Sequence, residues 1–111
     1  MLDTSPLSLR VDRLADRLRA APQSALRRGA AASGLALSRE LARRAQLREF
    51  PERVPYELPD AGPFAVGDQL AVAGHDLANA LSGTEDEEAL ADAVRLVDAE
   101  LTPAGFRADR S

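Results

Sequence analysis

The chain begins with a segment of clear helical periodicity, residues 5–20. Its apolar side chains follow one another at spacings of four, three and four, which places them on one stripe of a helix, at Leu7, Val11, Leu14 and Leu18. Ser5-Pro6 suits a helix start, because serine can cap free N–H groups and proline at the first helical position gives up a donor that would be unpaired anyway. Pro22 cannot continue the helix, so we expect it to end near Ala20.

Residues 24–49 predict a second, longer helix. Its apolar stripe shares one azimuth and comprises Leu26, Ala30, Leu37 and Leu41. A cluster of small residues at 29–34 would let another helix approach closely, and we expect a tight packing point against the first helix there. Its two glycines leave a kink as the alternative.

Five arginines of this second helix are candidate interaction residues. Three of them fall within about 60° of one another on the face opposite the apolar stripe, namely Arg28, Arg39 and Arg43. Arg44 and Arg48 instead continue the azimuth of the apolar stripe. Because core-facing positions turn to arginine there, we expect the last two turns to face an acidic surface, within the protein or on a partner.

A proline-rich strap, residues 50–63, separates the second helix from the third. Its four prolines are evenly spaced, at Pro51, Pro55, Pro59 and Pro63. Each proline pushes its predecessor towards extended geometry, and three apolar predecessors are expected to pack on the protein, namely Phe50, Val54 and Leu58. At about 3.1 Å per residue the strap can run about 40 Å, so it either returns along the bundle or folds up at one end. With Tyr56 it is also a candidate docking peptide.

Two further helices are predicted after the strap. The apolar stripe of the third, over residues 63–82, is Val66, Leu70, Ala73, Leu77 and Leu81. A second strip of small residues on the same helix suits close packing, at Gly67, Ala71, Gly74 and Ala78. Thr84 and Glu87 read as a capping box for the fourth helix, residues 84–102, whose stripe is Leu90, Val94, Val97 and Leu101.

These segments predict an all-α fold, a bundle of four amphipathic helices. The composition agrees, since 22 Ala and 17 Leu favour helix and strand formers are scarce. We expect a single domain over residues 1–111, built of helical pairs at 5–49 and 63–102, the strap at 50–63 and a frayed tail at 104–111. Because the stripes are narrow and rich in alanine, a homodimer that completes its core between subunits is an alternative.

Charge is divided unevenly between the two halves of the chain. Residues 1–50 carry ten Arg and five acids, whereas residues 51–111 carry four Arg and thirteen acids, and Lys does not occur. The halves are therefore +5 and −9, which the net charge of −4 conceals. Such halves either pair with each other or present two different surfaces to partners.

Catalytic chemistry has one candidate, His75, the only histidine of the chain. Asp76 adjoins it and Asp68 lies seven positions before it, but the helical stripe puts His75 on the outer face. The chain lacks cysteine, and one histidine without further nitrogen or sulfur ligands argues against a zinc site. No nucleophile motif or phosphate-binding glycine loop is present, so we expect no cofactor, no metal and no catalytic residue.

The pattern as a whole favours a small non-enzymatic interaction or regulatory module that binds a protein partner or itself. One alternative is a nucleic-acid-associated protein that uses the Arg faces of the first two helices, although the acidic net charge argues against it. Another is a small-molecule-binding protein or enzyme centred on His75. Since no uncharged run approaches the ~20 residues of a membrane span, we expect a cytoplasmic protein without a transmembrane segment.

Overall fold

The computed structural model describes residues 1–102, and in this range the chain forms helices joined by turns and one long extended connection. The elements in order are α1 (Ser5–Ala20), α2 (Gln23–Ala25), a π-helical turn η1 (Leu26–Ala30), α3 (Ala31–Glu49), a 3-10 turn η2 (Pro63–Ala65), α4 (Val66–Ser82) and α5 (Glu87–Leu101). No strand occurs among residues 1–102. The predicted all-α fold, its four helical segments and the strap are confirmed. The predicted frayed tail, 104–111, lies outside the described residues.

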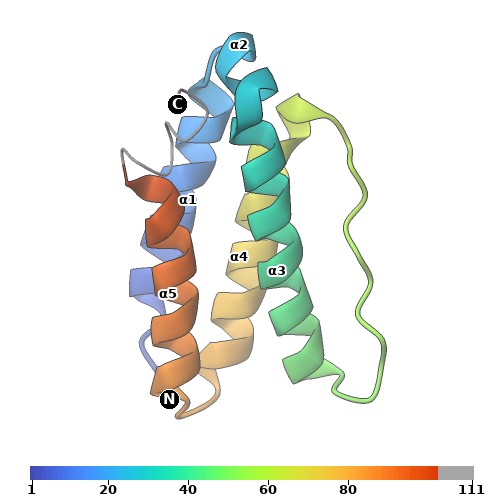
Figure 1. Cartoon of the computed structure of the whole chain (residues 1–111). Helices are drawn as coiled ribbons and strands as arrows, with labels where there is room; N and C mark the ends of the chain where they lie inside the picture. The colour runs from blue at the N-terminus through green and yellow to red at the C-terminus, as the bar shows by residue number, and fades with distance from the viewer. Residues whose placement is uncertain (103–111) are drawn as a thin grey trace.

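The strap decides the topology of the bundle. In Figure 1, α1 rises from the N-terminus, α3 descends, the strap rises along the outside, α4 descends and α5 rises again. The strap therefore returns along the bundle, so α3 and α4 are parallel to each other and antiparallel to α1 and α5. α4 packs against α1 and α3, and α1 also packs against α5, whereas α3 and α5 touch only sparsely.

The core consists largely of the stripes expected from the sequence. The four stripe residues of α1 are all buried, as are the five of α4. On α5 the prediction was wrong in detail, because Ala93 and Val97 are fully buried while Leu90 and Val94 are only partly buried. The small side chain of Ala93 therefore lies on the buried face of α5, the helix that packs against α1.

Glycines allow three close helix contacts. A Cβ on Gly74 of α4 would lie 2.5 Å from Val11 Cγ1 of α1, and one on Gly34 of α3 would lie 2.6 Å from Val66 Cγ1. Leu18 of α1 is also within 3.0 Å of that Gly34 position. The expected tight packing point against the first helix is thus found at Gly34.

The alternative expected for the same small-residue cluster, a kink, is found five residues earlier. Gly29 has φ 147° and ψ −20°, values outside the helical region, and it lies within the π-helical turn that joins α2 to α3. A residue with a Cβ rarely adopts such a positive φ, so glycine allows the bend here. The single helix predicted over 24–49 is therefore bent near its start.

Polar side chains, together with one of the three predicted apolar contacts, hold the strap. Gln46 of α3 pairs with both backbone groups of Tyr56, accepting from its N–H at 2.7 Å and donating to its carbonyl at 2.9 Å. Arg39 Nε donates to Leu58 O at 2.8 Å, and Gln69 Nε2 of α4 donates to Pro59 O at 2.9 Å.

Of the three apolar strap residues expected to pack on the protein, only Leu58 packs against the core. Val54 is 93% exposed and Phe50 46% exposed, so those two expectations were wrong. Extended backbone leaves its N–H and carbonyl groups free, and the long side chains of α3 and α4 satisfy several of them here.

The starts of α1 and α5 differ from the predicted caps. Ser5 is the first residue of α1 rather than its cap, and its N–H donates to Asp3 Oδ1 at 3.0 Å. At α5 the N-cap is Asp86, whose Oδ1 accepts from Ala89 N at 3.0 Å. Thr84 instead accepts from Asp86 N through its hydroxyl, so a turn precedes the cap and the predicted Thr84–Glu87 box does not form.

Candidate functional site

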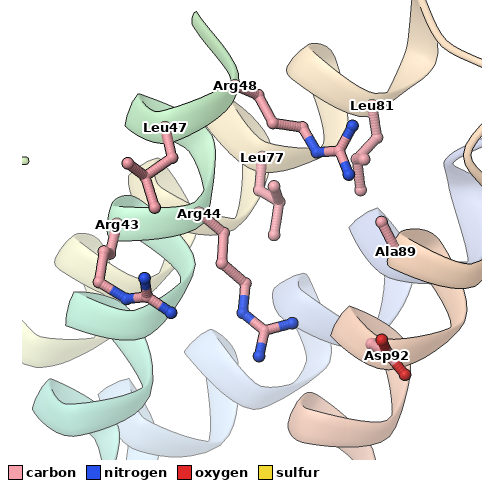
Figure 2. Close-up of a pocket in the computed structure, with 8 residues that line it drawn as sticks. All are labelled: Arg43, Arg44, Leu47, Arg48, Leu77, Leu81, Ala89 and Asp92. Atoms are coloured by element: carbon pink, nitrogen blue, oxygen red, sulfur yellow. The ribbon is translucent and has the colours of Figure 1, made fainter. Parts of the chain in front are cut away.

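The sparse contact between α3 and α5 leaves an open groove of about 360 Å³ on one side of the bundle. Its floor is formed by Leu77 and Leu81 of α4, and its walls by α3 and α5 (Figure 2). The residues lining it are Arg43, Arg44, Leu47, Arg48, Leu77, Leu81, Ala89 and Asp92. Leu77 and Leu81 are at most 1% exposed, so the apolar surface open to a partner is that of Leu47 and Ala89. Such apolar side chains surrounded by charged ones are the arrangement expected of a protein-binding groove.

The α3 wall of the groove is positively charged. Arg43 and Arg44 share one carboxylate, since Glu40 Oε2 accepts from Arg43 Nη2 at 2.6 Å and from Arg44 Nε at 2.7 Å. Hydrogen bonds from Arg43 and then Arg44 lower the pKa of Glu40 to about 2, against the partial burial that would raise it. Two guanidinium groups served by one carboxylate leave an excess positive charge on this wall.

One ion pair closes the end of the groove nearest the N-terminus of α5. Arg48 Nη2 lies 2.5 Å from Asp86 Oδ2, across the gap between the two helices. The Ala89 N–H and Arg48 both lower the pKa of Asp86, the backbone hydrogen bond being the larger cause. Asp86 therefore caps α5 and ties it to α3 at the same time.

The α5 wall carries acids. Asp92 lines the groove and pairs with Arg95 one turn later on its own helix. Glu88 is exposed at the start of the same wall. At 100° per residue Glu88, Asp92 and Arg95 lie within about 60° of one another, so two carboxylates and one guanidinium form one strip with an excess of one negative charge.

Arg44 and Arg48 only partly follow the expectation that they face acids. Arg48 does meet an acid of the other half of the chain, Asp86. Arg44 pairs instead with Glu40 of its own helix, and its guanidinium extends towards α5 in Figure 2. The expected junction between the two halves is thus found at Arg48, while Arg44 faces the groove.

Two other candidate residues, Arg39 and Tyr56, lie on the outer side of α3, where the strap passes. A second pocket of about 460 Å³ lies there, lined by Ala36, Arg39, Glu40, Arg43, Pro55, Tyr56 and Glu57. The Tyr56 ring is 66% exposed although its backbone is held by Gln46. Arg39 binds the strap carbonyl of Leu58, which gives it a structural task.

The remaining two candidates lie away from the groove. Arg28, in the π-helical turn η1, donates to Ser24 O of α2. His75 Nε2 lies 2.7 Å from Asp12 Oδ1, joining α4 to α1 with both side chains about half exposed. Within residues 1–102 no group of three or more metal-ligating side chains is placed to hold a metal ion.

The charged halves of the chain pair with each other at several points. Arg10 and Arg19 of α1 bind Asp98 of α5 and Asp68 of α4, both at 2.8 Å. With Arg48 and Asp86 these pairs link the basic first half to the acidic second half. Of the two expectations for the charge division, pairing within the fold is confirmed at these sites.

Several groove residues were missed in the sequence. Leu47 lies off the apolar stripe, about 120° from Leu41, so the periodicity does not predict its place in the groove. Glu40 stands three and four positions before Arg43 and Arg44, a spacing at which helical side chains interact, so this signal could have identified it. The roles of Asp86 and Asp92 depend on where α5 lies relative to α3, which no local pattern specifies.

No protein-family model, curated protein or solved structure matches this chain. Among residues 1–102, none of the helices combines the length and the apolar character needed to cross a bilayer.

Proposed function

We propose that this protein is a non-enzymatic interaction module that binds a helical protein surface through the groove between α3 and α5. The observation that carries the proposal is the groove itself, where the partly exposed apolar side chains of Leu47 and Ala89 lie between one basic and one acidic wall, above the buried Leu77 and Leu81. Helical partners commonly bind by laying an apolar face into such a groove while charged flanks fix the register.

Leu47 supports this interpretation. It is only partly buried on the rim of the groove although leucines of the α3 stripe are in the core. An apolar side chain at the rim can contact a partner directly, while Arg43 and Arg44 select the charge of that partner. Residues at the centre of such a contact carry most of the binding energy.

Site-specific photocrosslinking tests the proposal. A photoreactive benzoylphenylalanine replaces Leu47 in the full chain, which is then irradiated in the cells that naturally produce it. The matched control carries the same group at Leu9, which is 64% exposed on α1 and outside the groove. We expect a defined protein adduct, of this chain or of another, from position 47 and not from position 9. Equal labelling at the two positions, or none at 47, would refute the proposal.

The nucleic-acid alternative gains no support from the arginines whose partners are described. Arg10, Arg19 and Arg48 bind carboxylates of the second half of the chain, so part of the predicted basic faces is neutralised within the fold. The His75 alternative likewise gains no support, because that side chain pairs with Asp12 on an open surface outside the pockets described above.

A further inference from the structure

We propose that the partner bound by this groove is a second copy of the same chain, in a two-fold dimer whose axis runs parallel to the helices. This inference rests on the proposed function, and it names the occupant of the same surface. It follows from the charges of the two walls, from the symmetry that can match them and from the size of the face.

The face around the groove is bipolar. On the α3 side Arg43 and Arg44 share the single carboxylate of Glu40, and on the α5 side the strip of Glu88, Asp92 and Arg95 keeps an excess of one negative charge. A purely acidic helix would be attracted to the α3 wall and repelled by the α5 wall. The occupant must therefore present an acidic strip to α3 and a basic strip to α5 on either side of an apolar centre.

A second copy presents both strips in one orientation. Rotation by 180° about an axis parallel to the helices places α3 of one copy opposite α5 of the other and keeps each residue at its own level along the bundle. Arg43 and Arg44 then face Glu88 and Asp92 of the second copy, and the same contact is repeated by symmetry. A two-fold axis perpendicular to the helices would instead place α3 on α3 and α5 on α5, so each wall would face a wall of the same net charge, which is repulsive.

The apolar surface and the area also fit a dimer. Leu47 on α3 is only partly buried, and at 100° per residue it points away from the buried face of its helix. Leu96 on α5 is also partly buried, but it packs against the core. The molecule measures 40 × 26 × 21 Å, so even its narrower long face offers the roughly 800 Å² per subunit that a standard interface buries. Leu47 would lie near the centre of that contact.

A charge-swap experiment tests the pairing. One variant carries Arg43→Glu with Arg44→Glu, and the other carries Glu88→Arg with Asp92→Arg. Size-exclusion chromatography with light scattering is run on the wild type, on each variant and on their equimolar mixture at low salt. We expect a dimer for the wild type, monomers for each variant alone and a heterodimer for the mixture, because mixing restores opposite charges at both contacts. Each variant alone should weaken self-association at least tenfold.

Two further measurements keep the outcome interpretable if a charge variant folds poorly. Circular dichroism reports whether each variant is helical. Leu47→Asp is compared with Leu9→Asp, its exposed counterpart on α1, and only the first is expected to yield a monomer. If the two charge variants are each still dimeric when measured alone, the inference is overturned. It is also overturned if the Leu47→Asp protein dimerises as the wild type does.

Failure of the dimer is distinguishable from failure of the proposed function. A wild-type chain that remains monomeric up to about 1 mM overturns self-association. If position 47 then still crosslinks to a different protein, the groove is an interaction site with another occupant. If position 47 crosslinks to nothing, both proposals are wrong.

Discussion

Arg48 and Asp86, 38 positions apart in the sequence, form an ion pair that joins the end of α3 to the beginning of α5. Asp86 also caps α5 by accepting from Ala89 N. One carboxylate thus fixes both the start of a helix and its position across an open groove. The α3 and α5 walls are otherwise in sparse contact, and this pair joins them at that end of the groove.

Replacing Asp86 separates its two tasks. Asp86→Ala removes the cap and the ion pair and should lower the melting temperature by about 5 °C. Asp86→Asn keeps a good capping side chain but loses the charge, so its effect should be smaller and close to that of Arg48→Ala. Thermal denaturation followed by circular dichroism measures all three. Equal losses for Asp86→Ala and Asp86→Asn would mean that the cap contributes nothing.

Glu40 gives the protein a specific sensitivity to acid. Its pKa in the folded protein is about 2, against an ordinary value of 4.5, because Arg43 and Arg44 stabilise the ionised form. A lowered pKa means that its contribution to stability is complete above about pH 4.5 and is lost as the pH falls towards 2. At neutral pH we expect Glu40→Gln to cost about 1 kcal/mol, since solvent screens this partly exposed cluster.

Urea denaturation at about pH 6 and pH 3 tests this dependence. The loss of unfolding free energy between these two pH values should be smaller in Glu40→Gln than in the wild type. Glu52→Gln, at an exposed position of the strap, serves as the control and should retain the wild-type loss. A Glu40→Gln protein with the full wild-type acid sensitivity contradicts the prediction.

Gly74 sets the distance between α1 and α4. A Cβ at this position would lie 2.5 and 2.6 Å from the two γ carbons of Val11, so Gly74→Ala should destabilise the fold by about 1–3 kcal/mol through overpacking. Gly83→Ala is the matched control, because a Cβ there meets nothing within 4 Å and should change stability by less than about 0.5 kcal/mol. Chemical denaturation measures both. Adding Val11→Ala to Gly74→Ala should recover part of the loss, and its failure to do so would place the clash elsewhere.

Gln46 holds the strap against α3. Its amide pairs with both the N–H and the carbonyl of Tyr56, so Gln46→Ala should raise the hydrogen-exchange rate of the Tyr56 amide by about tenfold or more while changing global stability by only about 1 kcal/mol. Gln23→Ala, at an exposed position of α2, is the control. Unchanged exchange at Tyr56 in Gln46→Ala would show that other contacts hold the strap.

Local chemistry explains how much of the fold could be predicted. The periodic leucines and valines fixed the helical segments, because burial of one stripe is the main driving force for a helix in a small domain. Proline and glycine positions placed the ends of α1 and α4 within a residue or two. The caps at Ser5 and Thr84 were predicted wrongly because several neighbouring residues can accept the same free N–H groups, and the approach of Arg48 favours Asp86.

The strap shows where local reasoning stops. Evenly spaced prolines predicted an extended segment, which is confirmed, and the apolar residues before them suggested packing that only Leu58 makes. The strap returns along the bundle, where Arg39 and Gln46 of α3 and Gln69 of α4 donate to its carbonyl groups. Such contacts join residues 10 to 19 positions apart through a particular helix arrangement, which periodicity does not encode.

By itself the sequence determined that this protein is a bundle of four amphipathic helices, with a basic first half and an acidic second half. Only the tertiary structure decided that α3 and α4 run parallel, that Arg48 meets Asp86 and that Arg43, Arg44 and Leu47 line a groove with Asp92. The reason is physical. Helix formation and stripe composition are local properties of the chain, whereas the facing of two stripes depends on how the strap and the close contacts at Gly34 and Gly74 place whole helices against one another.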